Sequence, residues 1–443
     1  MSKGFLIAAP SSGQGKTLIT FGLLKALRDK GLAPQPFKTG PDYIDPRFHE
    51  RAANATCLNL DPWAMSPDRL HRLYGQNNKA QIRVVEGVMG LFDGAESKGP
   101  EPKEAESKGK NTSSAALAVE LGLPVILVVD CKGMAQSLAA LVHGFSTYNP
   151  HVNIAGLILN RVASPKHQRM LCADVKLPVF GCLPSVDGLK LESRHLGLKQ
   201  AQELGNLDDI IDRASTWIST HIDLDQLVTL SDAKTQNQSP TNTNPIPPLG
   251  QHIAIASDTA FAFAYPHLLD DWRRQGAELS FFSPLENQAP DPTANAIYLP
   301  GGYPELYAEH LAANTVFLQG LQKAAAEQKW IYGECGGYMV LGQSLTDAKG
   351  VRHNMAGLLP VETSFANPKR QLGYRQFQLL QDTPIGKCGQ VYRGHEFHFS
   401  SALTNSKTNL FSVTSATGET LGSLGHMQNT VFGSYLHLID ALG

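Results

Sequence analysis

Short apolar runs alternate with amphipathic segments along most of the chain. Residues 5–9 are apolar, and Leu18, Ile19, Leu23, Leu24 and Leu27 then recur at the spacing of one helical face. This predicts a strand, a loop and a helix in succession. Further strands are expected over 34–38, 83–86, 125–130, 154–160 and 179–183, with a helix over 114–121.

A second run of the same kind follows a polar, proline-rich segment. Residues 231–249 carry almost no apolar side chains before their final prolines, which is typical of a linker. Strands are then expected over 253–258, 279–283, 296–299, 330–333, 391–398 and 430–437. Strands that alternate with helices favour parallel sheets covered on both faces. We therefore predict two α/β domains, residues 1–230 and 250–443, joined by 231–249.

Two polar stretches interrupt the first domain. Residues 96–112 are charged and low in complexity, and we expect a mobile loop or lid there. Residues 39–46 contain two acids, an aromatic residue and two prolines, which favour a rigid turn over a helix. A solvated turn without function is the alternative for this second stretch.

Composition narrows the class of protein. A chain of 443 residues with 42% hydrophobic residues can bury two cores, and a net charge of −2 gives no field for nucleic acid or an anionic membrane. The six cysteines show no C-x-x-C pair, which suits a reducing compartment. No signal peptide and no apolar run of membrane-spanning length is visible. We expect a cytoplasmic protein, and we keep a homodimer as the expected assembly.

The loop between the first strand and helix carries a phosphate-binding pattern. Gly13 and Gly15 let backbone N–H groups approach a polyphosphate, and the following helix adds its positive end. Lys16 is expected at the β- and γ-phosphates of ATP, and Thr17 on Mg²⁺. Pro10 stands where the usual motif has its first glycine. The alternative is a glycine-rich turn with an incidental lysine.

Acidic side chains are expected beside this loop. Asp42 and Asp45 lie in the turn after the second strand, and Glu86 ends a later apolar strand. Carboxylates at these places are suited to Mg²⁺ held directly or through water. Glu86 could instead be a surface acid. Asn160, at the end of another strand, is a candidate for contact with the nucleotide base.

A second chemical centre is expected in the second domain. Cys335 lies between glycines where a strand meets a helix, which predicts a nucleophile elbow whose helix lowers the thiol pKa. His437 is the expected base, with His395 and His398 as weaker alternatives. The N–H groups of Gly301 and Gly302 are expected to stabilise an oxyanion. A small buried cysteine is the alternative.

The chain resembles a known family in these motifs. The elbow, the Gly-Gly turn and the late histidine resemble class I (flavodoxin-like) glutamine amidotransferases, and the first domain resembles dethiobiotin-synthetase-like P-loop proteins. Together with stretches 38–46, 85–94, 301–305 and 334–337, they are similar to cobyrinic acid a,c-diamide synthases. The resemblance implies ATP-dependent amidation of the a- and c-acetates of a corrinoid, with L-glutamine as nitrogen donor.

The resemblance also implies residue roles. It assigns Thr17, Asp42, Asp45 and Glu86 to Mg·ATP and the phosphorylated intermediate, with Asp45 as a catalytic group. It further assigns Tyr43 and Asp93 to the acetate that reacts.

Two departures from the family pattern are visible. Ile439 replaces the usual glutamate two residues after the histidine, so a Cys–His dyad is implied, and segment 96–112 is longer than usual. Two alternatives stay open. One is an a,c-diamide synthase of another tetrapyrrole, of the Ni-sirohydrochlorin type. The other is a nucleotide-switched binding protein with an inactive glutaminase domain.

Overall fold

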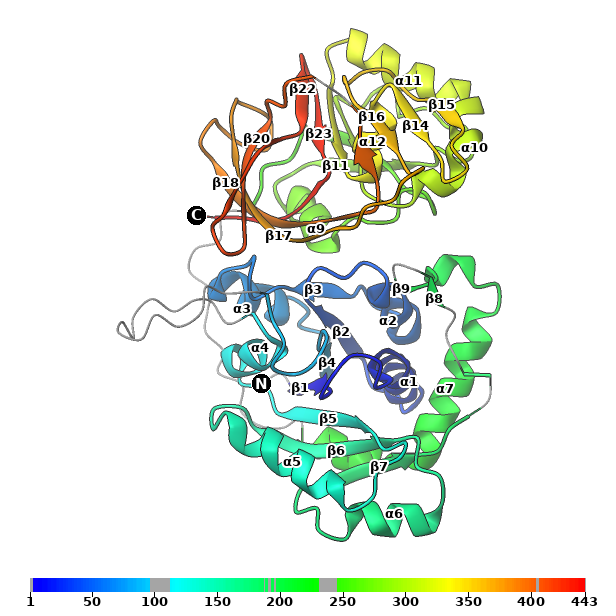
Figure 1. The fold of residues 1–443 in the computed structure, drawn as a ribbon, viewed down its shortest axis with the longest axis vertical. Coiled ribbons are helices and arrows are strands. Elements are labelled where there is room, and N and C mark those ends of the chain that lie inside the picture. The colour runs from blue at the N-terminus through cyan, green and yellow to red at the C-terminus, as the bar shows by residue number, and fades with distance from the viewer. Residues whose placement is uncertain are drawn as a thin grey trace. The chain divides into compact units, whose positions relative to one another are not determined.

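The computed structural model describes residues 3–95, 112–186, 188–189, 193–194, 197–230, 245–403 and 406–442. These residues form two compact α/β units, the first ending at residue 230 and the second starting at residue 245 (Figure 1). The predicted lid at 96–112 lies outside the described residues except for Thr112, and so does the linker up to residue 244. None of the helices in the described ranges is long and apolar enough to cross a membrane.

The first unit is built on a seven-stranded parallel sheet. Its strand order is β3-β2-β4-β1-β5-β6-β7, which places β1 between β4 and β5. The parallel sheet of the predicted α/β class is confirmed. The strands are β1 Lys3–Ala8, β2 Pro34–Thr39, β3 Leu58–Leu60, β4 Ile82–Glu86, β5 Val125–Asp130, β6 Ile154–Asn160 and β7 Val179–Leu183.

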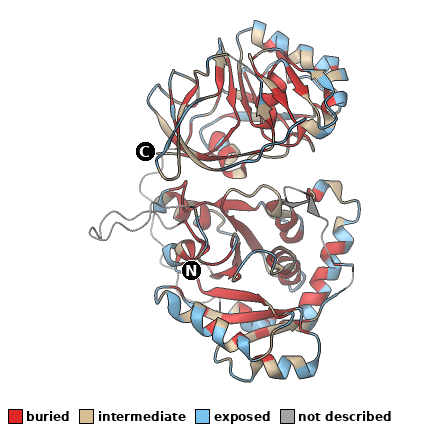
Figure 2. Cartoon of the chain, in the orientation of Figure 1, coloured by how far each residue is buried: buried red, intermediate tan, exposed pale blue. Residues whose placement is uncertain are grey.

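Helices bury both faces of this sheet. Phe5 and Ile7 of β1 pack into one core with α1 and α7, while Leu6, on the opposite face of the strand, is also fully buried. Figure 2 shows that the strands of the sheet are mostly buried, whereas buried and exposed residues alternate along the outer helices. The helices are α1 Lys16–Asp29, α2 Asp45–Ala53, α3 Pro67–Gly75, α4 Ser114–Leu121, α5 Ser137–Tyr148, α6 Pro165–Cys172, α7 Leu207–His221 and α8 Leu224–Leu230. Two minor strands and a 3₁₀ turn complete the unit: β8 Ser193–Arg194, β9 Gly197–Leu198 and η1 Ala201–Glu203.

The prediction of a turn over residues 39–46 is wrong for its last two residues. Helix α2 begins at Asp45, with Pro46 in its first turn. Proline is tolerated there because the first helical N–H groups have no partner within the helix. Asp42 accepts hydrogen bonds from the N–H groups of Ile44 (2.8 Å) and Asp45 (3.1 Å), which closes the turn just before the helix.

The second unit contains a six-stranded sheet of order β11-β10-β12-β13-β23-β22. Its first five strands are parallel in the flavodoxin-like order, and β22 is antiparallel. The strands are β10 His252–Ala256, β11 Glu278–Phe282, β12 Ala296–Leu299, β13 Trp330–Glu334, β22 His426–Gln428 and β23 Val431–Ser434. The helical elements are α9 Pro266–Arg274, η2 Pro304–Tyr307, α10 Ala308–Ala313, α11 Thr315–Ala326 and α12 Gly336–Leu341.

Two further sheets belong to the second unit. The four-stranded one has the order β15-β14-β16-β19, and the five-stranded antiparallel one has the order β21-β20-β17-β18-β24. The strands are β14 Ser344–Thr346, β15 Arg352–Asn354, β16 Glu362–Ser364, β17 Gln371–Leu379, β18 Val391–His398, β19 Ser401–Ala402, β20 Phe411–Ser415, β21 Thr420–Leu424 and β24 Leu436–Ala441.

The single strand predicted over 430–437 is divided between two sheets. Strand β23 ends at Ser434, and β24 starts at Leu436 beside β18. His437 therefore lies near the start of a new strand, opposite His395, and not at the end of a parallel strand. An apolar run can supply two strands when the chain turns from one sheet into another, and periodicity does not reveal that change.

Candidate active site

The loop after β1 has the geometry of a phosphate cradle. Gly13 and Gly15 adopt left-handed backbone angles (φ 80° and 93°), which favour glycine, and α1 starts at the next residue. Lys16 is mostly buried, and its ammonium donates to the carbonyl of Met89 at 2.5 Å. Burial lowers the pKa of Lys16, against the opposing effect of Glu86.

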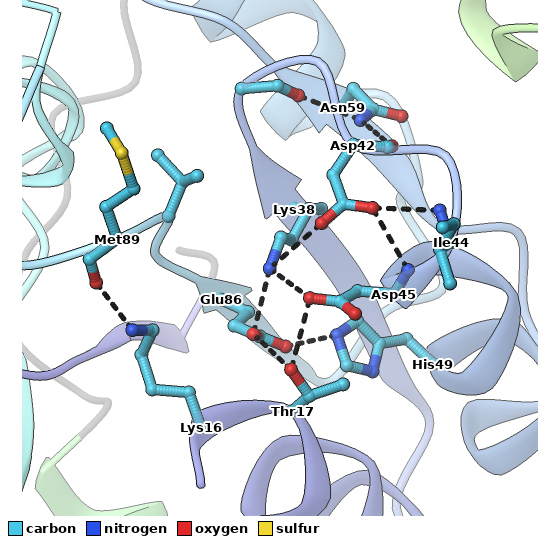
Figure 3. A network of polar contacts seen from close by, with 12 residues as sticks. Lys16, Thr17, Lys38, Asp42, Ile44, Asp45, His49, Asn59, Glu86 and Met89 are labelled. Carbon is cyan, nitrogen blue, oxygen red and sulfur yellow. Dashed lines mark hydrogen bonds and ion pairs between the residues drawn. The ribbon is translucent and has the colours of Figure 1, made fainter. Parts of the chain in front are cut away.

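Side chains from four elements meet beside this loop (Figure 3). The Thr17 hydroxyl lies 3.1 Å from both Asp45 Oδ2 and Glu86 Oε1. Lys38 Nζ lies 2.6 Å from Asp45 Oδ2 and 2.9 Å from Glu86 Oε1. Lys38 and Glu86 are partners in the parallel register of β2 and β4, so the sheet itself brings them together. The surface alternative for Glu86 is wrong, because its side chain is buried.

The charges in this cluster depend on one another. Burial disfavours the Lys38 ammonium, but Asp45 and Glu86 outweigh it and raise the pKa of Lys38 well above its usual value. Burial also disfavours the Glu86 carboxylate, but Lys38 and His49 hold its pKa well below the usual range. Burial, with the neighbouring charge of Asp42, raises the pKa of Asp45 to about 7. One carboxylate is thus firmly ionised, and the other titrates near neutrality.

The remaining predicted residues of this centre surround the cluster. Asp42 Oδ2 lies 3.6 Å from Lys38 Nζ, and Tyr43 is half-buried in the same turn. Asp93 is exposed and accepts a hydrogen bond from the N–H of Gly90 at 2.8 Å, in the loop whose Met89 carbonyl meets Lys16. The structure thus brings Asp42 into the cluster, with Asp93 on the loop that contacts Lys16.

Asn160 contacts the phosphate-binding loop from the end of β6. It ends β6, and its side-chain amide donates to the carbonyl of Gln14 at 2.9 Å. A Cβ at Gly15 would come within 2.6 Å of that amide, so the loop passes directly against Asn160. The neighbouring Arg161 pairs with Asp130 across β5 and β6.

Sequence reasoning gave no role to two buried members of the cluster, Lys38 and His49. His49 Nε2 lies 2.5 Å from Glu86 Oε2, and His49 is fully buried. Its position four residues after Asp45 places both on one face of α2, which the helical period could have indicated. Lys38 lies in a fully buried strand, and a charge at such a place needs a partner.

The second unit contains the predicted elbow. Cys335 has φ 45° and ψ −102°, between the end of β13 and the start of α12, and its N–H donates to the carbonyl of Ser434 at 2.8 Å. A Cβ at Gly337 would lie 2.0 Å from the carbonyl oxygen of Leu299, so only glycine fits there. The strained turn is confirmed.

The Gly-Gly turn links the elbow to His437. A Cβ at Gly301 would lie 2.3 Å from His437 Cε1, and a Cβ at Gly336 would lie 3.0 Å from the backbone nitrogen of Gly302. The turn therefore touches the histidine ring on one side and the residue after Cys335 on the other. The thiol itself lies 3.9 Å from the carbonyl of Phe397.

The two alternative histidines occupy different surroundings. The ring of His395 stacks on that of His437, with centroids 4.7 Å apart. His398 lies 3.1 Å from Glu396 and stacks on Tyr435 at 4.2 Å. His395 is thus a neighbour of the expected base, whereas His398 is hydrogen-bonded to Glu396, which in turn pairs with Arg375.

Burial controls the protonation of the pair. It raises the pKa of the Cys335 thiol, and Glu305 adds to the effect, so the expectation of a lowered thiol pKa is wrong. The six-residue helix behind the thiol provides one opposing hydrogen bond, from the N–H of Gly336, which is too little. Burial and the neighbouring His395 hold the pKa of His437 well below its usual value. Burial therefore keeps both the thiol and the imidazole in their neutral forms.

A phosphate-binding α/β unit and a cysteine elbow on a flavodoxin-like unit define the class of glutamine-dependent amide-forming ligases. Family models agree with this division. A CobQ/CobB/MinD/ParA nucleotide binding domain matches residues 5–198, and a CobB/CobQ-like glutamine amidotransferase domain matches residues 252–441.

Relatives narrow the class to one family. Proteins named hydrogenobyrinate a,c-diamide synthase are 48% identical in Brucella anthropi, over 100% of this chain and 99% of the relative, and 46% identical in Rhizobium meliloti, over 99% of each. Another, in Rhodobacter capsulatus, is 46% identical over 99% of this chain and 98% of its own length. The chain belongs to the family of a,c-diamide synthases.

Proposed function

We propose that the protein amidates the a- and c-acetate carboxylates of hydrogenobyrinic or cobyrinic acid, using ATP and ammonia released from glutamine. The observation that carries this proposal is the cluster of Thr17, Lys38, Asp45 and Glu86 beside a phosphate-binding loop, in a chain that also has a cysteine elbow. The names of the relatives favour the cobalt-free ring.

The first centre suits a magnesium nucleotide. Among the described residues, no group of three or more His, Cys, Asp or Glu side chains could hold a metal ion alone. A magnesium nucleotide brings its own phosphate oxygens and waters, so a hydroxyl and one or two carboxylates are enough. Thr17 and Glu86, with Asp45 or Asp42, would hold it, because these hard oxygens lie together beside the loop. When bound, magnesium–ATP supplies the phosphoryl group that activates the acetate.

The residues of this centre then have distinct tasks. Lys16 neutralises charge on the phosphoryl oxygens during transfer. Tyr43 and Asp93 orient the acetate, and Asn160 contacts the base of the nucleotide. Asp45 accepts the proton that ammonia loses as it displaces phosphate from the acyl phosphate.

The second centre releases that ammonia. The Cys335 thiol gives its proton to His437 as the sulfur attacks the side-chain carbonyl of glutamine. The N–H groups of Gly301 and Gly302 stabilise the oxyanion, and His437 passes the proton to the departing ammonia. Water then hydrolyses the thioester to glutamate. The imidazole has to be neutral to accept the thiol proton, but the burial that keeps it neutral also makes it a weaker base.

The test is mass spectrometry with glutamine that carries a heavy isotope in its amide nitrogen. The purified protein, ATP and Mg²⁺ are incubated separately with hydrogenobyrinic acid, cobyrinic acid and Ni-sirohydrochlorin. We expect two labelled amides on one of the first two substrates, and none with the Cys335→Ala variant. Amidation of Ni-sirohydrochlorin alone would overturn the corrinoid assignment. If the protein binds one of these tetrapyrroles only in the presence of ATP and amidates none of them, the nucleotide-switched binding protein would be favoured.

Three expectations remain proposals: the division into domains 1–230 and 250–443, a homodimer and a cytoplasmic location. Light scattering coupled to size-exclusion chromatography tests the assembly. Limited proteolysis tests the division, since cleavage should concentrate in 231–249.

A further inference from the structure

A buried glutamate lies directly before the nucleophile. Glu334 is 1% exposed and accepts three hydrogen bonds. The Tyr298 hydroxyl donates to its Oε2 at 2.9 Å, while the Tyr332 hydroxyl (2.8 Å) and the N–H of Leu438 (3.2 Å) donate to its Oε1. A buried carboxylate is costly, so such a residue needs either a structural or a functional reason.

The third of these bonds joins the strand that leads into Cys335 to the strand that carries His437. Glu334 is the residue before Cys335, and Leu438 is the residue after His437. Strand β13 belongs to the six-stranded sheet, whereas β24 belongs to the five-stranded one. Among the described strands, β24 pairs only with β18. Strand β23 pairs with β13 as far as Glu334 and Ser434 and leads into β24 after one residue, so the bond from the Leu438 N–H to Glu334 holds β24 beside β13 beyond that connection.

We propose that Glu334 is a positioning residue that holds the strand of His437 in line with Cys335 through the N–H of Leu438. It acts through the backbone that follows His437, and two residues after the histidine this chain has the buried Ile439. Glu334 does not touch the substrate in this scheme, and its Oε1 needs only to accept a hydrogen bond. This inference rests on the glutaminase part of the proposed function.

The test compares two substitutions that differ in this acceptor. Glu334→Leu removes it, and we expect kcat for glutamine hydrolysis to fall about 10–100-fold, the cost of misplacing a reacting group by about an ångström. KM for glutamine should stay within about twofold of wild type, because the binding groups are untouched. Glu334→Gln keeps an acceptor oxygen, and kcat should stay within about threefold of wild type.

Two further variants separate positioning from general packing. Tyr298→Phe removes only the hydroxyl on Oε2, away from Leu438, and should leave kcat within about threefold of wild type. Replacing Leu438 by its α-hydroxy acid converts one backbone amide to an ester and deletes the N–H alone. This change should lower kcat as Glu334→Leu does, and it keeps the test valid if Glu334→Leu does not fold.

The outcomes are distinct. Unchanged kcat in both Glu334→Leu and the Leu438 ester would overturn the proposal. A Glu334→Gln variant as slow as Glu334→Leu would also overturn it, since Glu334 would then act through its charge. A wild-type protein that neither hydrolyses glutamine nor reacts at Cys335 with an electrophilic glutamine analogue would overturn the proposed glutaminase, and this inference with it. Wild-type hydrolysis that Cys335→Ala abolishes would uphold the glutaminase whatever Glu334 does.

Discussion

Lys38 and Glu86 are register partners near the ends of adjacent parallel strands and form a buried ion pair with a nitrogen–oxygen distance of 2.9 Å. The same ammonium also contacts Asp45, so one cation balances two carboxylates that touch Thr17. Removing one member of such a group leaves an uncompensated buried charge.

Lys38→Met should therefore destabilise the first unit by about 3–5 kcal/mol and abolish amide synthesis. Thermal melting and synthesis with ammonium salt measure the two effects. Lys30→Met is the matched control, because Lys30 pairs with Asp225 in an exposed position, and it should cost less than about 1 kcal/mol. Equal melting temperatures for both variants would show that Lys38 does not balance the cluster.

Lys16→Ala should abolish synthesis while glutamine hydrolysis at Cys335 continues. Loss of one preorganised charge at a transferring phosphoryl group typically costs about 10²–10³ in kcat. Glutamine hydrolysis in the same preparation is the internal control for folding. Synthesis at the wild-type rate would refute the assignment of this loop to ATP.

Asp45→Asn and Glu86→Gln should each raise the Mg²⁺ concentration needed for half-maximal synthesis, because each removes a hard oxygen charge. A magnesium titration at saturating ATP measures this. Glu86→Gln should have an additional effect on stability, since Lys38 and His49 both lose a charged partner. Identical magnesium curves for wild type and both variants would exclude a metal role.

Cys335→Ser and His437→Ala should eliminate glutamine-dependent synthesis but leave synthesis with ammonium salt intact. Removing a nucleophile or its base raises the barrier by roughly 4–8 kcal/mol, by analogy with other catalytic residues. His395→Ala is the comparison variant, because His395 is an alternative base and its ring stacks on that of His437. If His395→Ala loses activity and His437→Ala keeps it, the assignment of the base is wrong.

Glu334 should make stability depend on pH. Burial raises the pKa of Glu334 to about 7, so the folded protein keeps a proton that the unfolded chain releases near pH 4.3. Between these values, rising pH therefore lowers the free energy of unfolding, by a total on the order of 4 kcal/mol. Glu334→Gln should flatten this dependence, as melting curves across the range would reveal. Parallel curves for wild type and variant would contradict the raised pKa.

Local signals in the sequence were sufficient for the phosphate loop and the elbow. Gly13, Gly15 and Lys16 lie within four residues of one another, and Cys335 is flanked by its own glycines. The predicted bounds of β5, β6 and β7 are also confirmed, because a buried parallel strand reads as a continuous apolar run between polar ends.

The tertiary structure decided which residues far apart in the sequence meet and how deeply they are buried. Lys38 meets Glu86 only because β2 and β4 are neighbours in the sheet, although 48 residues separate them in the chain. The change of sheet between β23 and β24, which positions His437, leaves no periodic signal in an apolar run. The raised pKa of Cys335 likewise follows from burial by distant segments, which a local motif cannot report. The sequence by itself determined the chemical groups and the class of fold, and the packing of distant strands decided their partners and protonation, because burial and register are properties of the whole fold.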